Sequence, residues 1–159
     1  CNERLDNWPR AEMNFRRALE LAPNQPLVLN YLGYSLVEKR LNLEEAQTMI
    51  ETALAAQPNN GAIADSLGWV FYRLGKFQDA VAPMEKAVQL EANDPVVNDH
   101  LGDVYWMVGR KREAEFQWRR AISFHPADED LARIRRKLEF GLDTVLAEEA
   151  KLEAKPSAQ

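Results

Sequence analysis

The stretch DSLGWVFYRLGKFQDAVAPMEKAVQLEA, residues 65–92, has two close relatives in the same chain, one beginning at residue 29 and the other at residue 99. Each version carries a Leu-Gly pair, and the glycines are Gly33, Gly68 and Gly102. These glycines are 35 and then 34 residues apart. A fixed period of this length predicts an array of structural repeats, in which one unit of structure is stacked on the next.

Two alanine positions follow the same period. The first is occupied by Ala11, Ala46, Ala80 and Ala114, and the second by Ala18, Ala53, Ala87 and Ala121. The one extra residue falls in the polar segment 39–45, where a loop absorbs an insertion without loss of helical register. Apolar residues on either side of that segment follow helical spacing, so each repeat is predicted to be a helix, a turn and a second antiparallel helix.

Small residues at fixed places in helices indicate close packing between helices. A glycine inside a helix costs about 0.5–1 kcal/mol relative to alanine, which predicts a neighbouring backbone close to Gly33, Gly68 and Gly102. Trp118 lies four residues after a repeated alanine, and Ile50 and Met84 occupy the same place in the other repeats. We therefore expect Trp118 in the core.

The combined pattern resembles the tetratricopeptide repeat (TPR). Its elements are the Leu-Gly pair, a large apolar residue three positions later, two alanines seven apart and a closing proline. The resemblance implies an all-α, right-handed superhelical solenoid of antiparallel helix pairs. The expected divisions are a partial repeat at 1–25, complete repeats at 26–60, 61–94 and 95–128, a capping helix at 129–150 and a frayed tail at 151–159. Within the cap, Gly141 is expected to bend or split the helix.

A looser resemblance concerns the C-terminal part of proteobacterial TPR outer-membrane lipoproteins. It rests on LVLNYLGYS, DSLGWVFYRLG, NDHLGDVYWMVGR and IRRKLEFGLDTVLAEE. The resemblance implies a bacterial adaptor that brings partner proteins to envelope enzymes, on the periplasmic side of the outer membrane. A cytoplasmic location is the alternative. Cys1 has two interpretations, a lipidated first residue or, as we favour, a helix cut in the middle.

Composition limits the classes of function. The chain has 159 residues and a formal net charge of −5, which argues against a general nucleic-acid-binding protein. The segment 110–137 is richer in basic than in acidic residues, so RNA binding there remains a less favoured alternative to a solvated helix surface. No apolar run approaches the roughly 18 residues of a transmembrane helix.

Catalytic motifs are not recognisable in the sequence. His100 and His125 are the only histidines, and neither belongs to a zinc-ligand pattern. The glycines are isolated and periodic and do not form a phosphate-binding loop. We therefore expect no cofactor, no metal and no enzymatic activity.

The remaining candidate site is the concave surface that the first helices of the repeats line. Polar and aromatic residues occupy equivalent positions there, which favours binding of an extended or helical peptide. The candidate residues are Asn30, Tyr34, Asp65, Trp69, Tyr72, Arg73, Asp99, Asp103 and Trp106. Because Arg73 is the only basic member, recognition of an acidic C-terminal tail is disfavoured.

The predicted function is thus that of an adaptor that binds a protein or peptide, with no small-molecule substrate. An inert spacer within a longer solenoid is the alternative. The helix around Phe15 and Leu19 lacks a complete first helix before it, and so we also expect self-association through the N-terminal end.

Overall fold

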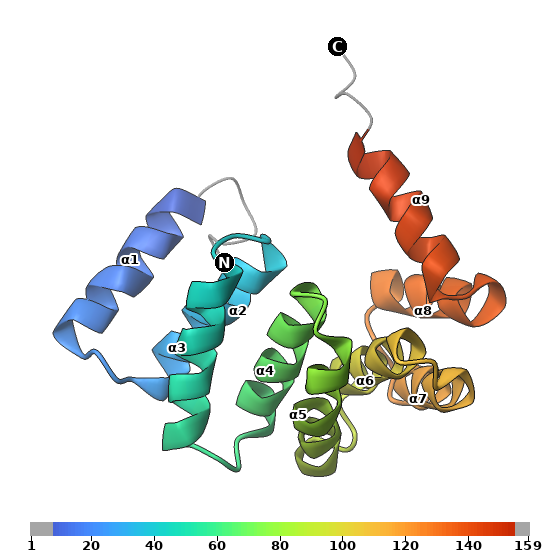
Figure 1. Ribbon diagram of the computed structural model, residues 1–159, viewed down its shortest axis with the longest axis horizontal. Coiled ribbons are helices and arrows are strands. Elements are labelled where there is room, and N and C mark those ends of the chain that lie inside the picture. Colours follow the sequence, from blue (N-terminus) through green and yellow to red (C-terminus); the bar gives the residue numbers. More distant parts are fainter. Residues whose placement is uncertain (1–7, 155–159) are drawn as a thin grey trace. The chain divides into compact units, whose positions relative to one another are not determined.

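The computed structural model describes residues 8–154, and every regular element in that range is an α-helix. The chain forms two compact units, Cys1–Glu91 and Ala92–Gln159, which are described separately below. Figure 1 shows the nine helices of the described range, labelled in chain order. The all-α architecture predicted from the repeat period is confirmed.

Unit 1 contains five helices. They are α1 (Trp8–Leu21), α2 (Pro26–Glu38), α3 (Leu43–Ala56), α4 (Gly61–Arg73) and α5 (Phe77–Leu90). Helices α2 and α3 form one packed pair, and α4 and α5 form the next (Figure 1). The pairs are stacked, because α4 also packs against both α2 and α3, and α1 packs against α2.

Unit 2 contains one further pair and a different ending. Its helices are α6 (Pro95–Met107), α7 (Lys111–Ser123), α8 (Asp128–Phe140) and α9 (Leu142–Ala154). Helices α6 and α7 pack together as a pair, α8 packs against α7, and α9 packs against α8. The segment expected as a cap over 129–150 consists of two helices that are separated at Gly141, the residue that was expected to bend or split it.

The turns within the pairs explain the irregular period. The turn between α2 and α3 comprises residues 39–42, whereas the equivalent turns comprise residues 74–76 and 108–110. The extra residue therefore lies in the loop where the sequence placed it. Gly75 and Gly109 have φ angles of +78° and +86° in the two shorter turns. These are backbone conformations that glycine adopts without strain.

Side-chain caps begin two of the first helices. The Oδ1 atom of Asn60 accepts hydrogen bonds from the backbone N–H groups of residues 62 and 63 at the start of α4. Asp94 does the same for residues 96 and 97 at the start of α6. These contacts satisfy N–H groups that have no partner within the helix, and they fix where each repeat begins.

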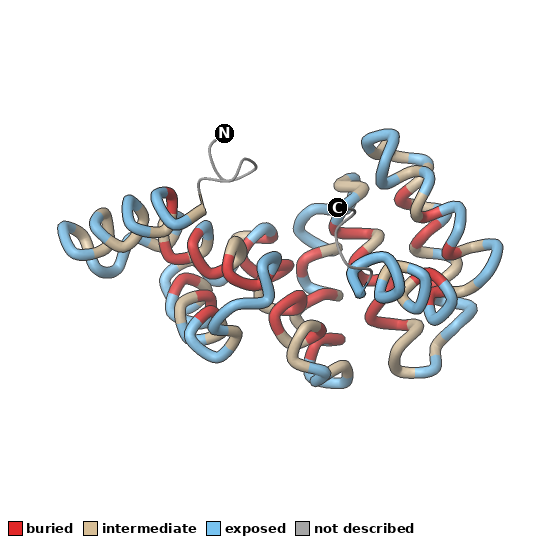
Figure 2. Tube along the Cα trace, turned by 90° about the horizontal axis from the view of Figure 1, so that it is seen from above, coloured by how far each residue is buried: buried red, intermediate tan, exposed pale blue. Residues whose placement is uncertain are grey.

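The core lies between the two helices of each pair, and Figure 2 shows buried residues alternating with exposed ones along the paired helices. Trp118 is fully buried, as predicted, and so are Ile50 and Met84 at the equivalent positions. A Cβ atom added at Gly33 would lie 2.8 Å from the side chain of Ile50. The repeated glycines therefore permit the close approach that their position in the sequence indicated.

Candidate functional site

We name the predicted residues of unit 1 the first-helix face. Its members on α2 are Asn30 and Tyr34, and those on α4 are Asp65, Trp69, Tyr72 and Arg73. Both helices are first helices of repeats, and α2 packs directly against α4. The structure therefore brings these six predicted residues onto two neighbouring helices of one unit.

Trp69 is held in position on this face by several contacts. Its Nε1 atom donates a hydrogen bond to Oε1 of Glu38 on α2, at 3.2 Å. Its ring stacks on that of Tyr72, with centroids 4.5 Å apart and an interplanar angle of 4°. The guanidinium of Arg73 lies 5.3 Å from the Trp69 ring centroid. With only 5% of its surface exposed, Trp69 is a fixed part of the face.

Tyr34 lies among charged groups of both helices. Burial raises the pKa of its hydroxyl far above the usual value, and the carboxylates of Glu38 and Asp65 add to the effect, whereas Arg73 opposes it. A hydrogen bond with Glu38 also contributes to the raised pKa. Tyr34 thus stays a neutral hydrogen-bonding group over the physiological pH range.

Two polar atoms of the first-helix face are buried without a hydrogen-bond partner among the residues that the structure describes. One is Oδ1 of Asn30, which is an acceptor, and the other is Nε of Arg73, which is a donor. A buried polar atom without a partner costs about 1–3 kcal/mol. Both atoms are shielded from solvent, so this cost is borne within the fold.

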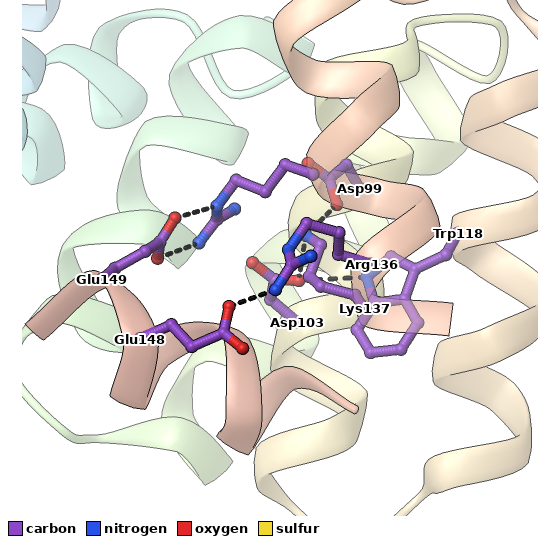
Figure 3. A network of polar contacts seen from close by, with 8 residues as sticks. Asp99, Asp103, Trp118, Arg136, Lys137, Glu148 and Glu149 are labelled. Carbon is purple, nitrogen blue, oxygen red and sulfur yellow. Dashed lines mark hydrogen bonds and ion pairs between the residues drawn. The ribbon is translucent and has the colours of Figure 1, made fainter. Parts of the chain in front are cut away.

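The three predicted residues of unit 2 are engaged within that unit. Asp103 is 1% exposed, and its Oδ1 atom accepts hydrogen bonds from Trp118 Nε1 at 3.0 Å and from Lys137 Nζ at 2.7 Å. Asp99 also pairs with Lys137. Figure 3 shows Lys137 reaching from α8 to both aspartates of α6. Trp106 donates from Nε1 to Oδ1 of Asp143 on α9, at 3.2 Å.

The cluster around Lys137 holds more negative than positive charge. Two carboxylates share one ammonium group, and Oδ2 of Asp103 is buried with no partner among the described residues. Burial raises the pKa of Asp99, and the neighbouring Asp103 raises it further, while Lys137 opposes both effects. The ammonium also lies 5.3 Å from the ring centroid of Trp118.

Two ion pairs join α8 to α9 beside this cluster (Figure 3). Arg133 donates to both carboxylate oxygens of Glu149, at 2.7 and 3.0 Å, and Arg136 pairs with Glu148. The hydrogen bonds of the first pair raise the pKa of Arg133 and lower that of Glu149. All four side chains are about one third to one half exposed, so each pair stabilises the helix contact by about 1 kcal/mol or less.

The sequence analysis did not assign Arg133 and Lys137 to this site, although the repeat period contains the signal. Arg133 follows Asp99 by 34 residues, and Lys137 follows Asp103 by 34. Helix α8 thus continues the positions of a first helix with basic residues in place of acidic ones. The pattern was missed because α8 lacks the Leu-Gly pair that marks the other repeats.

Other kinds of site find little support in the described range. Residues 8–154 contain no group of three or more His, Cys, Asp or Glu side chains arranged to hold a metal ion. Within the same range, no helix is both long and apolar enough to span a membrane. Cys1 and the other residues before position 8 lie outside the described range.

Comparisons with known proteins agree with the repeat pattern. The tetratricopeptide repeat family model matches residues 38–95, from the end of α2 to the start of α6. A TPR repeat-containing protein of Pseudomonas aeruginosa is 35% identical over 78 residues. These matches support the tetratricopeptide repeat family. The aligned region is 49% of this chain but only 13% of that relative, so it corresponds to a small part of the larger TPR protein.

Solved structures extend the likeness across most of the fold. MamA 41-end from Desulfovibrio magneticus RS-1 has a TM-score of 0.68 at 21% identity, covering 77% of this chain and 69% of that chain. A second crystal structure of MamA has a TM-score of 0.65 at 18% identity, covering 91% of this chain and 90% of that one. At these identities the comparison establishes a shared all-α fold of stacked TPR-like helix pairs.

Proposed function

We propose that this chain is a protein-interaction module that binds a peptide or protein segment on the first-helix face of unit 1. It acts as an adaptor and not as an enzyme. The TPR match covers α3, α4 and α5, which include four of the six residues of this face. In stacked helix pairs, the first helices line the concave side, where an extended ligand contacts several repeats at once.

The observation that carries the proposal is the grouping of polar and aromatic side chains on α2 and α4, two helices that pack against each other. Trp69 and Tyr72 form a rigid stacked pair beside Arg73. Aromatic rings and arginine are the residue types that dominate binding energy in protein interfaces.

The face also limits the chemistry of the ligand. Asp65 and Glu38 contribute negative charge near Tyr34, whereas Arg73 is the only basic residue among the six. We therefore expect a segment with neutral or basic side chains and do not expect an acidic C-terminal tail.

Site-directed photo-cross-linking tests this function. A photoreactive amino acid at Asn30 should capture a defined partner from the source organism, whereas the same group at the exposed Thr48 on α3 should not. Thr48 is a matched control because it lies in the same helix pair. Equal capture from both positions, or capture from neither, would contradict binding at the first-helix face and favour an inert spacer.

Once a partner is known, calorimetry tests the individual contacts. We expect Trp69→Ala combined with Asp65→Ala to weaken binding by about 2 kcal/mol or more, as for clustered hot-spot residues. Asn30→Ala and Arg73→Ala should each weaken it by about 1 kcal/mol, because each removes one hydrogen-bonding group. Circular dichroism must show that helicity is retained, and unchanged affinity in a folded variant rejects the site.

The alternative of RNA binding through 110–137 receives less support from the geometry. Five of the basic residues in that segment form ion pairs within unit 2. They are Arg110, Arg119, Arg133, Arg136 and Lys137. Paired side chains neutralise fewer phosphates, so we expect little salt-dependent binding to single-stranded RNA.

The resemblance to outer-membrane lipoproteins adds a proposed setting. In that setting, the partner would be an envelope protein, and the chain would bring it to an envelope enzyme. Membrane fractionation of the native protein tests this idea, since an outer-membrane adaptor should sediment with that membrane.

A further inference from the structure

The predicted site residues of α6 contact the chain's own C-terminal helices, α8 and α9. We name Asp99, Asp103 and Trp106 of α6 the α6 face. Lys137 of α8 pairs with both aspartates, and Asp143 of α9 accepts a hydrogen bond from Trp106. A Cβ atom at Gly141 would lie 3.0 Å from the Trp106 ring, so the joint between α8 and α9 also contacts this face. All of these contacts lie within unit 2.

The contact has a defined chemical pattern. The two aspartates are four residues apart and thus lie on one side of α6. Arg133 and Lys137 are likewise four apart on α8, and both aspartates act electrostatically on Arg133 as well. The apolar Ile134, between the two, is 1% exposed. The α6 face therefore accommodates a helix that carries two basic residues one turn apart.

Such a contact is selective, but its polar centre adds little stability. Lys137 loses its hydration entirely, and a buried ion pair often fails to repay that loss. Here the balance is poorer still, because Asp103 Oδ2 has no partner among the described residues and Asp99 is only 13% exposed. The ion pairs with Glu148 and Glu149 are partly exposed and contribute little. A competing helix with the same charges would regain these polar contacts, so the hairpin's own hold on the α6 face rests mainly on its buried apolar residues, such as Ile134 and Leu142.

We propose that the α8–α9 hairpin is an internal, displaceable ligand of the α6 face, and that a basic helix of a partner protein takes its place. The partner helix carries a lysine that bridges Asp99 and Asp103, with an arginine or lysine four residues before it. This inference rests on the proposed function in one respect, because both assume that a first helix of a repeat provides the binding surface. It concerns unit 2, whereas the proposed peptide site lies in unit 1.

A synthetic peptide spanning residues 128–140 serves as the probe helix, and hydrogen exchange of the full chain is the measurement. Excess peptide should speed exchange in α9 while α6 keeps its protection. Lys137→Glu in the full chain should speed exchange in α9 by about tenfold or more, because breaking a buried pair is strongly unfavourable. Arg135→Glu is the matched control, since Arg135 is an exposed residue of the same helix, and exchange should stay as in the wild type.

Fluorescence anisotropy with the labelled peptide completes the test. The peptide should bind the Lys137→Glu chain about tenfold or more tightly than the wild type, because the internal competitor is gone. A peptide with glutamate at the position of Lys137 should not bind. Equal affinity for both chains, or no binding to a Lys137→Glu chain whose α6 and α7 remain protected, overturns the proposal.

If Lys137→Glu also speeds hydrogen exchange in α6 and α7, the variant is too disrupted for the binding test. The proposal is then tested by hydrogen exchange of the wild-type chain with added peptide. Unchanged exchange in α9 at millimolar peptide then overturns the proposal. The exchange and anisotropy measurements report on unit 2 and do not affect cross-linking at Asn30 in unit 1. A negative result for the displaceable hairpin is therefore distinguishable from a negative result for the peptide site.

Discussion

At the scale of single residues, the repeated glycines differ in what surrounds them. A Cβ atom at Gly68 would lie 2.8 Å from the flexible end of Met84, whereas one at Gly102 would overlap the rigid indole of Trp118. Methionine adjusts to irregular gaps, but a buried indole that donates a hydrogen bond to Asp103 does not move freely. The same position therefore tolerates replacement of glycine by alanine to a different degree in these two repeats.

We predict that Gly102→Ala destabilises the protein by about 1–3 kcal/mol through overpacking. Gly68→Ala should be nearly neutral, because the better helix propensity of alanine, about 1 kcal/mol, offsets the shift of Met84. Urea denaturation of both variants measures the difference. Equal stability of the two would show that Trp118 adjusts as easily as Met84.

Asp99 gives a prediction about pH. Its pKa is raised in the folded state by burial and by Asp103, with Lys137 acting in the opposite direction and His100 and Arg133 as further charged neighbours. A carboxyl with a raised folded pKa stabilises the fold most below its unfolded pKa of about 3.9, and this contribution is lost as pH rises through the folded pKa. Asp99→Asn removes the titration.

The unfolding free energy of Asp99→Asn, relative to the wild type, should therefore increase as pH rises from about 4 toward 7. Urea denaturation at a series of pH values gives this difference directly. A difference that falls with rising pH would mean that attraction to Lys137 outweighs the cost of burying Asp99.

At the scale of elements, the joint between α8 and α9 depends on Gly141. Its φ and ψ angles are +88° and 153°, a region that only glycine occupies readily. An alanine there would also meet the Trp106 ring at 3.0 Å. The orientation of α9 relative to α8 therefore depends on the backbone conformation of one residue.

We predict that Gly141→Ala weakens the hairpin by about 1–3 kcal/mol, the usual cost of a strained backbone. Faster hydrogen exchange in α9 would report it. Gly109→Ala is the matched control in the same unit, because Gly109 has a φ of +86° but no atom within 4 Å of an added Cβ. Its effect should be smaller and should not extend to α9.

The sequence alone predicted the helices that follow the 34- to 35-residue period. It did not predict the packing of α8 and α9, which lie after the last complete repeat. The core position of Trp118 follows from a repeated position that Ile50 and Met84 also occupy, so the copies reinforced one another. The helices α8 and α9 occur once, so although Gly141 marked a possible break, no second copy showed how the two helices pack. The partner of Lys137 lies 34 residues away, and finding it requires knowing that α8 occupies a first-helix position.

The polar face of the first helices was predictable in position but not in environment. Equivalent spacing in the repeats identified Asn30, Asp65 and Trp69 as candidate residues of the first helices. Spacing says nothing about burial, however, and Trp69 is bound to Glu38 and stacked on Tyr72 rather than open to solvent. Such contacts depend on side-chain geometry that a repeat pattern does not encode.

At the scale of the whole molecule, exposed apolar residues near the N-terminal end bear on oligomeric state. Met13 on α1 and Leu27 on α2 are each 61% exposed, and Tyr31 nearby is 53% exposed. Large apolar side chains that remain accessible favour association between copies. We propose that this end mediates self-association at high concentration.

Met13→Glu combined with Leu27→Glu should reduce association in sedimentation experiments at millimolar concentration. Leu152→Glu is the control, because Leu152 is 69% exposed but lies on α9. A strict monomer in the wild type would refute the prediction. Loss of association with Leu152→Glu instead would move the contact to the C-terminal helices.

The joint at Gly141 also differs in length from the turns within the pairs. Helices α4 and α5, like α6 and α7, are separated by three residues, which lets the second helix fold back along the first. Between α8 and α9 there is only Gly141, so this hairpin lacks the three-residue turn that joins the helices of the other two pairs. The one-residue joint is thus the place where the connection between paired helices departs from the repeat. Lengthening this joint to three residues would give α8 and α9 the same connection as the other pairs, and further engineered repeats could then be added after α9.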